Sequence, residues 1–261
     1  MEFVMKILEG KIVVITGAGT GIGKETALLF AASGARTILV GRRLSLIESV
    51  AEEIALNDGV AEAISVDLED GDAIDEFGKN VLEKYGAIDI LVNNAGHSSK
   101  VRSLRYVDHK EWDSVFKVNI EAVYRLTQSF IHSMIEHGKG TVITVSSVAA
   151  LNPGLLGGAP YSAAKAASHN LMGHINSELN DLGIRACTIF PAEVDTPILN
   201  NRPLPPSSNE RASMMQPKDI AQAILLCASM PQRTVVEEIV LKPTRKRDVS
   251  ADLYAAATKE K

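Results

Sequence analysis

The sequence has few cysteines, no long hydrophobic run and no excess of basic residues. Its two cysteines, Cys187 and Cys227, stand in separate apolar segments, and neither they nor the six histidines show the spacing of a disulfide framework or a metal site. Lysine and arginine total 27 against 32 aspartates and glutamates, a net charge of −5 that is atypical of nucleic-acid-binding proteins. No apolar segment approaches the roughly 18 residues of a membrane span. We therefore expect a cytoplasmic protein that binds neither nucleic acid nor membranes.

The composition is typical of a globular protein. Of 261 residues, 46% are hydrophobic and 23% are charged. A single α/β domain routinely reaches about 200–250 residues, so we expect residues 1–261 to form one domain. Residues from about 193 to 216, where Asn, Pro and Ser dominate Asn200–Ser208, are expected to form a substrate loop or lid. In the tail, from about residue 243 to 261, the neighbouring basic run Lys242–Arg247 is expected to face solvent.

Short runs rich in Val and Ile alternate with longer amphipathic segments. The predicted strands are Ile12–Thr16, Thr37–Val40, Ala63–Val66, Ile88–Asn93, Thr141–Ser146, Arg185–Phe190 and Val235–Leu241. The predicted helices are Ile22–Ser33, Leu44–Leu56, Ala73–Tyr85, His109–His137, Tyr161–Leu182 and Lys218–Met230. Continuous apolar strands are typical of parallel sheets that helices cover on both faces. The alternation predicts a Rossmann-type, doubly wound α/β fold with a seven-stranded, mainly parallel sheet.

A glycine-rich turn joins the first predicted strand to the first helix. It reads Thr16-Gly17-Ala18-Gly19-Thr20-Gly21-Ile22-Gly23. Glycines permit a tight turn and close approach of the backbone to a pyrophosphate, while the helix N-terminus offers free N–H groups and the positive end of its dipole. Tight strand-to-helix turns also select glycine for structural reasons alone. The position after the first strand favours dinucleotide binding.

Further motifs follow the later strands in a fixed order. They are Asp67 after the third strand, Asn93-Asn94-Ala95-Gly96 after the fourth, Asn119 in the long helix, Ser146-Ser147 after the fifth, Tyr161-x-x-x-Lys165, and Pro191 to Thr196 after the sixth. With the T-G-x-x-x-G-x-G spacing of the glycine turn, this series is similar to the short-chain dehydrogenase/reductase family along almost the whole chain. The resemblance implies an oxidoreductase that uses a nicotinamide dinucleotide.

The residues after the second predicted strand favour NADP(H) over NAD(H). Enzymes for NAD usually place a carboxylate there to bind the ribose 2′-hydroxyl, whereas this chain has Gly41, Arg42 and Arg43. A guanidinium can bind a 2′-phosphate through two charge-assisted hydrogen bonds. The two arginines could instead simply begin a solvent-facing helix. Many NADP(H)-dependent relatives also carry a basic residue in the glycine turn, where this chain has Thr20.

The resemblance implies roles for the remaining cofactor-binding residues. Asp67 would hydrogen-bond the adenine amino group, with Leu68 beside the ring, and Lys165 would hold the nicotinamide ribose. Val194 and Thr196 would bind the nicotinamide carboxamide, in a segment where Ala192 replaces a common glycine. The full expected set is Gly17, Gly19, Thr20, Gly21, Ile22, Gly23, Arg42, Arg43, Asp67, Leu68, Asn94, Ala95, Gly96, Tyr161, Lys165, Pro191, Val194 and Thr196, with Asn93 structural.

Tyr161 and Lys165 stand four residues apart on one helix, so their side chains share a face. A tyrosine with an ordinary pKa near 10 is a poor base at neutral pH, and a nearby lysine cation would lower that pKa. By the resemblance, Tyr161 is the general acid/base of carbonyl reduction and alcohol oxidation, while Asn119 orders a proton-relaying water. Such a pair alone is more typical of a packed aromatic beside a surface lysine.

Ser147 is expected to position the substrate oxygen. Neighbouring residues at a strand end point in opposite directions, so only one of Ser146 and Ser147 can face the cofactor; we favour Ser147. The catalytic set is then Asn119, Ser147, Tyr161 and Lys165. The expected substrate pocket contains His97, Ser147, Leu155 and Leu156, and Arg202 and Arg211 are possible partners for an anion.

The predicted function is NADP(H)-dependent interconversion of a ketone or aldehyde with a secondary or primary alcohol. The alternatives are an NAD-dependent alcohol or 3-hydroxy-acid dehydrogenase, a non-catalytic dinucleotide-binding regulator, and a nucleotide-sugar epimerase or dehydratase, which the glycine spacing disfavours. The small-molecule substrate, the reaction direction and the product stereochemistry stay open. Because the family pairs subunits through the helices predicted at His109–His137 and Tyr161–Leu182, we expect a homotetramer or homodimer.

Overall fold

The computed structural model describes residues 6–259, which form a seven-stranded sheet between two layers of helices. All seven strands are parallel, in the order β3-β2-β1-β4-β5-β6-β7. They are β1 Ile12–Thr16, β2 Arg36–Gly41, β3 Val60–Ser65, β4 Ile90–Asn93, β5 Gly140–Val145, β6 Ile184–Pro191 and β7 Glu238–Leu241. The predicted fold class is therefore confirmed, and the step from β1 to β4 is the point at which the strand order reverses.

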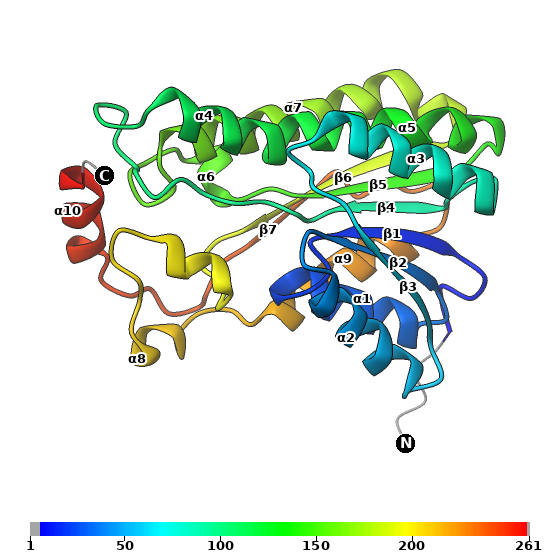
Figure 1. The fold of residues 1–261 in the computed structure, drawn as a ribbon, viewed down its shortest axis with the longest axis horizontal. Helices are drawn as coiled ribbons and strands as arrows, with labels where there is room; N and C mark the ends of the chain where they lie inside the picture. Colours follow the sequence, from blue (N-terminus) through cyan, green and yellow to red (C-terminus); the bar gives the residue numbers. More distant parts are fainter. Residues whose placement is uncertain (1–5, 260–261) are drawn as a thin grey trace.

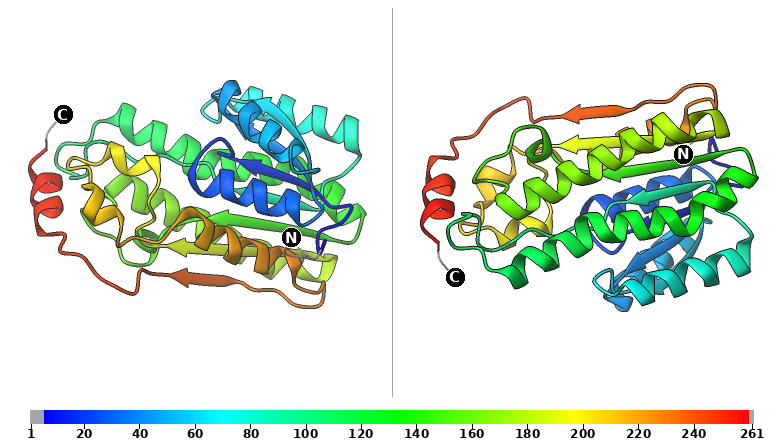
Figure 2. Two further views of the ribbon diagram at one scale, coloured as in Figure 1. Left: turned by 90° about the horizontal axis from the view of Figure 1, so that it is seen from below. Right: turned by 90° about the horizontal axis from the view of Figure 1, so that it is seen from above.

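Helices cover both faces of the sheet (Figure 1). The lower layer in that view contains α1 Gly21–Ala32, α2 Leu44–Ala55 and α9 Pro217–Ser229. The upper layer contains α3 Gly71–Tyr85, α4 His109–Phe116, α5 Ala122–Glu136 and α7 Ala159–Leu179. Figure 2 shows α5 and α7 lying side by side along the upper face, and α1 and α9 along the lower.

The central strands are largely apolar because their side chains face one of two hydrophobic layers. On β1, Val13 and Ile15 pack with the layer of α1, α2 and α9, whereas Val14 packs with the layer of α3, α5 and α7. All three side chains are fully buried. This alternation explains why the sequence shows continuous hydrophobic runs rather than the one-sided pattern of a sheet with a solvated face.

The predicted long helix His109–His137 is interrupted. A π-helical turn, Lys117–Glu121, separates α4 from α5 and carries Asn119. π-helical turns are uncommon and occur frequently at functional sites. The prediction of one continuous helix was wrong because a change in backbone hydrogen bonding leaves little trace in the apolar spacing.

Several short helices were not predicted. They are α6 Val148–Leu151, a 3-10 helix at Pro197–Asn201, α8 Ser208–Arg211 and α10 Ser250–Thr258. The substrate loop therefore contains a 3-10 helix and α8 rather than an irregular chain. No helix among residues 6–259 combines the length and apolar character needed to cross a bilayer.

The tail does not behave as a solvated extension. Arg247, at the end of the run expected to face solvent, has only 7% of its side chain exposed and forms ion pairs with Glu193, Glu210 and Asp252. These partners fasten the tail and α10 to the substrate loop, at the end of the molecule where α8 and α10 lie in Figure 1. The expectation of a solvent-facing run was wrong for Arg247, because a local charge count does not show which carboxylates the fold brings near.

Candidate active site

The glycine turn is shaped by backbone conformation and close packing. Gly17 and Gly21 have φ angles of +66° and +56°, which side-chain-bearing residues rarely adopt. A Cβ on Gly23 would lie 2.2 Å from the carbonyl oxygen of Gly17, so the helix can start this close to the turn only with glycine there. Gly23 therefore supports the turn rather than lining the cleft in front of it.

The segment after β4 is tied directly to the end of β1. The Thr16 hydroxyl accepts hydrogen bonds from the backbone N–H groups of Asn94 (3.0 Å) and Ala95 (2.9 Å). The Asn94 side-chain amide donates in return to the Thr16 carbonyl oxygen at 2.9 Å. Asn93, expected to be structural, is 2% exposed. These bonds hold the loops after β1 and β4 together at the reversal of strand order, where open α/β sheets bind ligands.

A cleft of about 380 Å³ lies over the carboxyl ends of β1, β2, β3 and β4. It is lined by most of the residues expected to bind the dinucleotide: Gly17, Gly19, Thr20, Gly21, Ile22, Arg42, Arg43, Asp67, Leu68, Asn94, Ala95, Gly96 and Thr196. The sequence did not single out the lining residues Leu46, Ile47, Val66, Val118, Pro197 and Ile198. All of these are apolar, and apolar residues next to a strand end give no signal that separates a cleft wall from the core.

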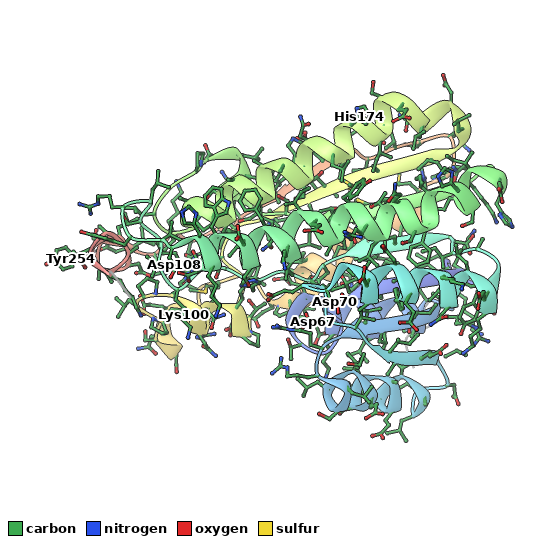
Figure 3. All side chains as sticks on the ribbon, turned by 45° about the horizontal axis from the view of Figure 1, so that its top comes forward. Asp67, Asp70, Lys100, Asp108, His174 and Tyr254 are labelled. Atoms are coloured by element: carbon green, nitrogen blue, oxygen red, sulfur yellow. The ribbon has the colours of Figure 1, made fainter. Side chains whose placement is uncertain are left out.

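Asp67 is free of the helix-capping role that a strand-end aspartate often has. Asp70 caps α3, accepting from the backbone N–H groups of Asp72 and Ala73. Within residues 6–259, the Asp67 carboxylate accepts only the turn N–H of Glu69. Figure 3 shows the two aspartates next to each other, and Asp67 lines the cleft. The Asp67 carboxylate is therefore available to a ligand in the cleft.

Both arginines expected to select the cofactor are exposed at the cleft. Arg42 lies 3.7 Å from the carboxylate of Glu69, with 61% of its side chain exposed. Arg43 precedes the first turn of α2 without capping it through its side chain. An exposed pair at this distance is weak, so Glu69 leaves the Arg42 guanidinium available to another anion.

A second cavity, of about 340 Å³, adjoins the cleft and is lined by Tyr161 and Lys165, which stand four residues apart on α7. Five residues line both spaces, which makes them continuous: Ile22, Asn94, Gly96, Thr196 and Ile198. Pro191 and Val194, expected to contact the nicotinamide, line this second cavity rather than the cleft. Gly96 and Thr196 therefore lie at the boundary between the two spaces, and Tyr161 lies on the side of the second cavity.

Burial raises the pKa of Tyr161, while the Ser147 hydroxyl and the cations Arg102 and Arg202 act in the opposite direction. Lys165 is not among the groups that shift it, although its Nζ lies 5.7 Å from the centre of the Tyr161 ring. That Lys165 lowers the tyrosine pKa stays a prediction. The Lys165 Nζ donates instead to the carbonyl oxygen of Val145 at 2.8 Å, and burial lowers its own pKa to about 8.

The two adjacent serines have different surroundings. The Ser146 hydroxyl is 3% exposed and donates to the carbonyl oxygen of Lys165 at 2.9 Å, which anchors β5 to α7. The Ser147 hydroxyl accepts from the backbone N–H of Ala149 at the start of α6 and is one of the groups that act on Tyr161. Ser147 is therefore the serine whose hydroxyl meets the tyrosine.

Asn119 lies fully buried in the π-helical turn. Its side-chain amide donates to the carbonyl oxygens of His97 and Val115, both at 2.8 Å, and its Oδ1 has no hydrogen-bond partner among residues 6–259. A Cβ on Gly96 would lie 2.7 Å from that Oδ1 and 3.2 Å from the Lys165 Nζ. The absence of a side chain at Gly96 thus leaves room for the asparagine oxygen and the lysine nitrogen next to it.

Three expected substrate residues lie elsewhere. His97 lines the cofactor cleft, with its Nε2 3.0 Å from the carbonyl oxygen of Ser114, and Leu155 lines neither space, although Leu156 lines the second cavity. Arg211 is occupied within the substrate loop by Asp195 at 2.8 Å and Asn200 at 2.6 Å. Their positions depend on how the loops after β4, β5 and β6 fold back, which sequence spacing does not reveal.

Two charged residues of the second cavity were missed. Arg102 and Glu193 line it together with Arg202, which was considered as an anion partner. Arg102 is 3% exposed, and a nearly buried arginine is the only signal that could have identified it; that signal needs the tertiary structure. Among residues 6–259, no three His, Cys, Asp or Glu side chains cluster as metal ligands, and His174 lies on the outer side of α7 (Figure 3).

Known proteins share both the sequence and the fold. The family model for short chain dehydrogenases matches residues 11–205. An uncharacterized oxidoreductase of Staphylococcus aureus strain N315 is 34% identical over 241 residues, covering 92% of this chain and 100% of that protein. A metagenomic short-chain oxidoreductase in complex with NADP superposes with a TM-score of 0.80 at 32% identity, covering 92% of this chain and 100% of the other.

A fourth similarity adds a relative with a named activity. The 3-ketoacyl-(acyl-carrier-protein) reductase from Brucella melitensis, complexed with NADH, superposes with a TM-score of 0.81 at 30% identity, covering 91% of this chain and 99% of the other. The matched residues 11–205 include the glycine turn, the serine pair and the Tyr161–Lys165 pair. The chain therefore belongs to the short-chain dehydrogenase/reductase family and is an oxidoreductase of that family.

Proposed function

We propose that this protein is an NADP(H)-dependent oxidoreductase that interconverts a ketone or aldehyde with a secondary or primary alcohol. The observation that carries the proposal is the continuity of the two spaces. A cleft over the strand ends adjoins, through Gly96 and Thr196, a cavity lined by Tyr161, Ser147 and Lys165. A bound dinucleotide would reach from the arginines after β2 to the tyrosine.

The residues lining the cleft fit a dinucleotide. The turn Gly17–Gly23 and the N-terminus of α1 suit the pyrophosphate, because free backbone N–H groups and the helix dipole favour anions. The available carboxylate of Asp67 and the buried Leu68 suit the adenine, and Val194 and Thr196 suit the nicotinamide carboxamide. When bound, the nicotinamide would supply or accept the hydride.

The protein's own residues would handle the proton. Because burial raises the Tyr161 pKa, the phenol stays protonated at neutral pH and can donate its proton to a carbonyl oxygen during reduction. Ser147 holds that oxygen by a hydrogen bond and keeps it in reach of the phenol. Lys165 binds the nicotinamide ribose, and Asn119 orders the proton path that resupplies the tyrosine.

The preference for NADP(H) rests on charge. Arg42 and Arg43 are exposed at the cleft where the ribose 2′-substituent of an adenine dinucleotide falls, and a phosphate there would gain two cationic partners. The related solved structures bind NADP in one case and NADH in the other, so relatives alone do not favour either. The test is fluorescence titration of the purified protein with NADPH and NADH, alongside Arg42→Ala.

NADPH is expected to bind at least ten-fold more tightly than NADH, and Arg42→Ala is expected to remove most of that difference. Lys110→Ala, at an exposed lysine of α4 that does not line the cleft, serves as the control and should keep the wild-type preference. Tighter binding of NADH by the wild-type protein would assign the enzyme to NAD. Failure of both dinucleotides to bind would contradict the proposed function.

Tyr161→Phe tests the role of the phenol. General acid catalysis contributes about 10²–10⁴-fold, so we expect kcat for carbonyl reduction to fall about 10³-fold while the dinucleotide still binds. The measurements are NADPH consumption and the fluorescence titration on the same preparation. Retention of more than a tenth of the wild-type kcat would show that another group donates the proton.

We further propose that the protein is a homotetramer or homodimer paired through α4, α5 and α7. Tyr124 on α5 has 49% of its surface exposed, on the layer that Figure 2 shows as one continuous helical face. Large exposed aromatics are typical of interface cores. Light scattering checks the assembly, and a monomeric mass would contradict it.

A further inference from the structure

The cavity at Tyr161 contains more positive than negative charge. The ionisable side chains that line it are Arg102, Lys165, Arg202 and Glu193, besides Tyr161 itself. Lys165 is explained by the ribose-binding role proposed above. The two arginines have no part in binding the ribose, so the groups that pair with each arginine indicate its role.

The charge of Arg202 is balanced within the protein. Its Nη1 lies 2.7 Å from Glu193 and 3.7 Å from Asp252. Arg247 binds the same two carboxylates at 2.9 and 2.7 Å. Two cations therefore meet two buried carboxylates, with Glu210 at the rim as a third. This cluster needs no further anion.

Arg102 has no such partner. Its Nη1 donates to the carbonyl oxygen of Gly157 at 2.5 Å and its Nη2 donates to the Ser98 hydroxyl at 3.1 Å, while its Nε bonds to nothing among residues 6–259. Within the described chain no carboxylate lies within 4.0 Å of it. Burial and the neighbouring Arg202 lower its pKa to about 10, against Tyr161 and the carboxylate of Glu111, which raise it, and Arg102 stays charged at neutral pH.

A buried cation with only neutral partners is costly, because it gives up hydration without the attraction of a counter-ion. Arg102 is nevertheless held firmly. Gly158 has a φ of +83°, and a Cβ there would lie 2.8 Å from the Arg102 Cδ, so the loop closes directly on the arginine stem. The fold thus fixes an unpaired cation in the wall of the reaction cavity.

Arg102 and Tyr161 line the same cavity, and each shifts the other's pKa. A molecule whose carbonyl oxygen meets the tyrosine can therefore place a negative group against the arginine. The single unpaired positive charge of Arg102 would be neutralised by a substrate that carries one negative charge. Glu193, which lines the same cavity, would repel a second.

We propose that the substrate is a short oxo acid, reduced to the hydroxy acid, whose carboxylate pairs with Arg102. This inference rests on the proposed function and narrows its substrate class. In the reaction the carbonyl carbon gains a hydride from the reduced dinucleotide and the oxygen gains the Tyr161 proton, which solvent replaces. The carboxylate is unchanged and serves to orient the molecule, as a guanidinium and a carboxylate do through paired hydrogen bonds.

The first experiment compares matched substrates on the wild-type enzyme. The pairs are 2-oxobutanoate and 3-oxobutanoate, each against its methyl ester, which keeps the carbonyl and removes the charge. We expect at least one acid to exceed its ester by ten-fold or more in kcat/KM. If the esters are reduced as well as the acids or better, the inference is overturned and the proposed function stands. Preferential reduction of dihydroxyacetone phosphate over both acids would also overturn the assignment of a single negative charge.

Variants then assign the preference to Arg102. Arg102→Gln is expected to bring the acid-to-ester ratio of kcat/KM close to one, and Arg102→Lys to retain most of it. Arg105→Gln is the matched control, since Arg105 lies on the same loop and its Nη2 binds the Ala257 carbonyl oxygen outside the cavity; it should keep the wild-type ratio. An unchanged ratio in Arg102→Gln would overturn the inference.

A binding measurement on the wild-type protein tests the inference in two further cases. In one, the Arg102 variants do not fold, and in the other, the wild type reduces neither pair of substrates. Calorimetry on the wild-type protein saturated with dinucleotide compares 3-hydroxybutanoate with butane-1,3-diol. Tighter binding of the acid supports the anion site at Arg102 even if neither pair is reduced, and the search for the substrate then continues among longer oxo acids. Equal binding, or none, overturns the inference.

Discussion

The cofactor cleft and the substrate end of this protein are built in different ways. The cleft uses backbone: glycines with positive φ, a helix N-terminus, and hydrogen bonds between Thr16 and the segment after β4. The substrate end uses ion pairs between side chains far apart in the chain, such as Glu193 with Arg247 and Arg202 with Asp252. The first region depends on the backbone at the carboxyl ends of neighbouring strands, and the second on how the tail returns to the substrate loop.

This difference follows from what each region binds. Every nicotinamide dinucleotide carries the same pyrophosphate, and backbone N–H groups recognise it independently of side-chain identity. Substrates differ between relatives, so the part that selects them is made of side chains on loops, which tolerate change without unfolding the sheet. The charge cluster of Glu193, Arg202, Arg247 and Asp252 holds such loops in place.

The largest expected effect comes from removing the tail's central cation. Arg247→Met leaves Glu193 and Asp252 with Arg202 as their remaining cation. Burial raises the pKa of Glu193, and hydrogen bonds from Arg247 and Arg202 outweigh it and hold that pKa below the ordinary value, so the carboxylate loses one of its two stabilising partners. Breaking a buried ion pair costs about 3–5 kcal/mol, and we expect about 3 kcal/mol here. Chemical denaturation measures the loss.

Trypsin digestion separates local from global loosening in the same variant. Cleavage in the segment 245–247 is expected to quicken at least ten-fold in Arg247→Met. Arg245→Met removes one trypsin site as well, but Arg245 is exposed, so its digestion should stay close to that of the wild type. Equal digestion of the two variants would show that the ion pairs do not hold the tail.

A smaller effect is expected from the glycine turn. Gly23→Ala places a Cβ 2.2 Å from the Gly17 carbonyl oxygen, so the turn must shift, at a cost of about 2 kcal/mol in stability and with weaker dinucleotide binding. Gly173→Ala, in α7, meets no atom within 4 Å and should stabilise by about 0.5–1 kcal/mol. Thermal unfolding and NADPH titration report both. Unweakened NADPH binding in Gly23→Ala would mean that the turn tolerates a different shape.

A third effect, similar in size to that of Gly23→Ala, concerns pH. Burial lowers the folded-state pKa of Lys165 to about 8, below the value near 10.4 of an unfolded chain. Above pH 8 the folded state releases this proton while the unfolded state keeps it, so the stability of the wild type rises relative to Lys165→Met as pH increases. Between pH 7 and 9.5 the difference should change by about 2 kcal/mol. A difference that does not vary with pH would show that Lys165 is not desolvated in the absence of ligand.

Sequence patterns predicted the bounds of helices and strands well where an apolar run or a single turn glycine set those bounds. The bounds of β1 agree in full, and the end of α1 before Gly34 follows from that glycine's φ of +94°. The third strand was placed too late, because Val60–Ser65 is only partly buried and its alternating Ala and Glu lack the apolar run that marked the others. The break at Lys117–Glu121 left no pattern at all.

The sequence by itself determined the doubly wound fold, the glycine turn, and the pairing of Tyr161 with Lys165, because helix and strand periodicity and backbone conformation act over a few residues. Only the tertiary structure decided that Ser147 rather than Ser146 meets the tyrosine, that Arg102 lies unpaired beside it, and that Arg247 closes the substrate loop. Burial and electrostatic pairing depend on distances between segments far apart in the chain. No local pattern carries those distances, so the charges that select a substrate become visible only once the chain has folded.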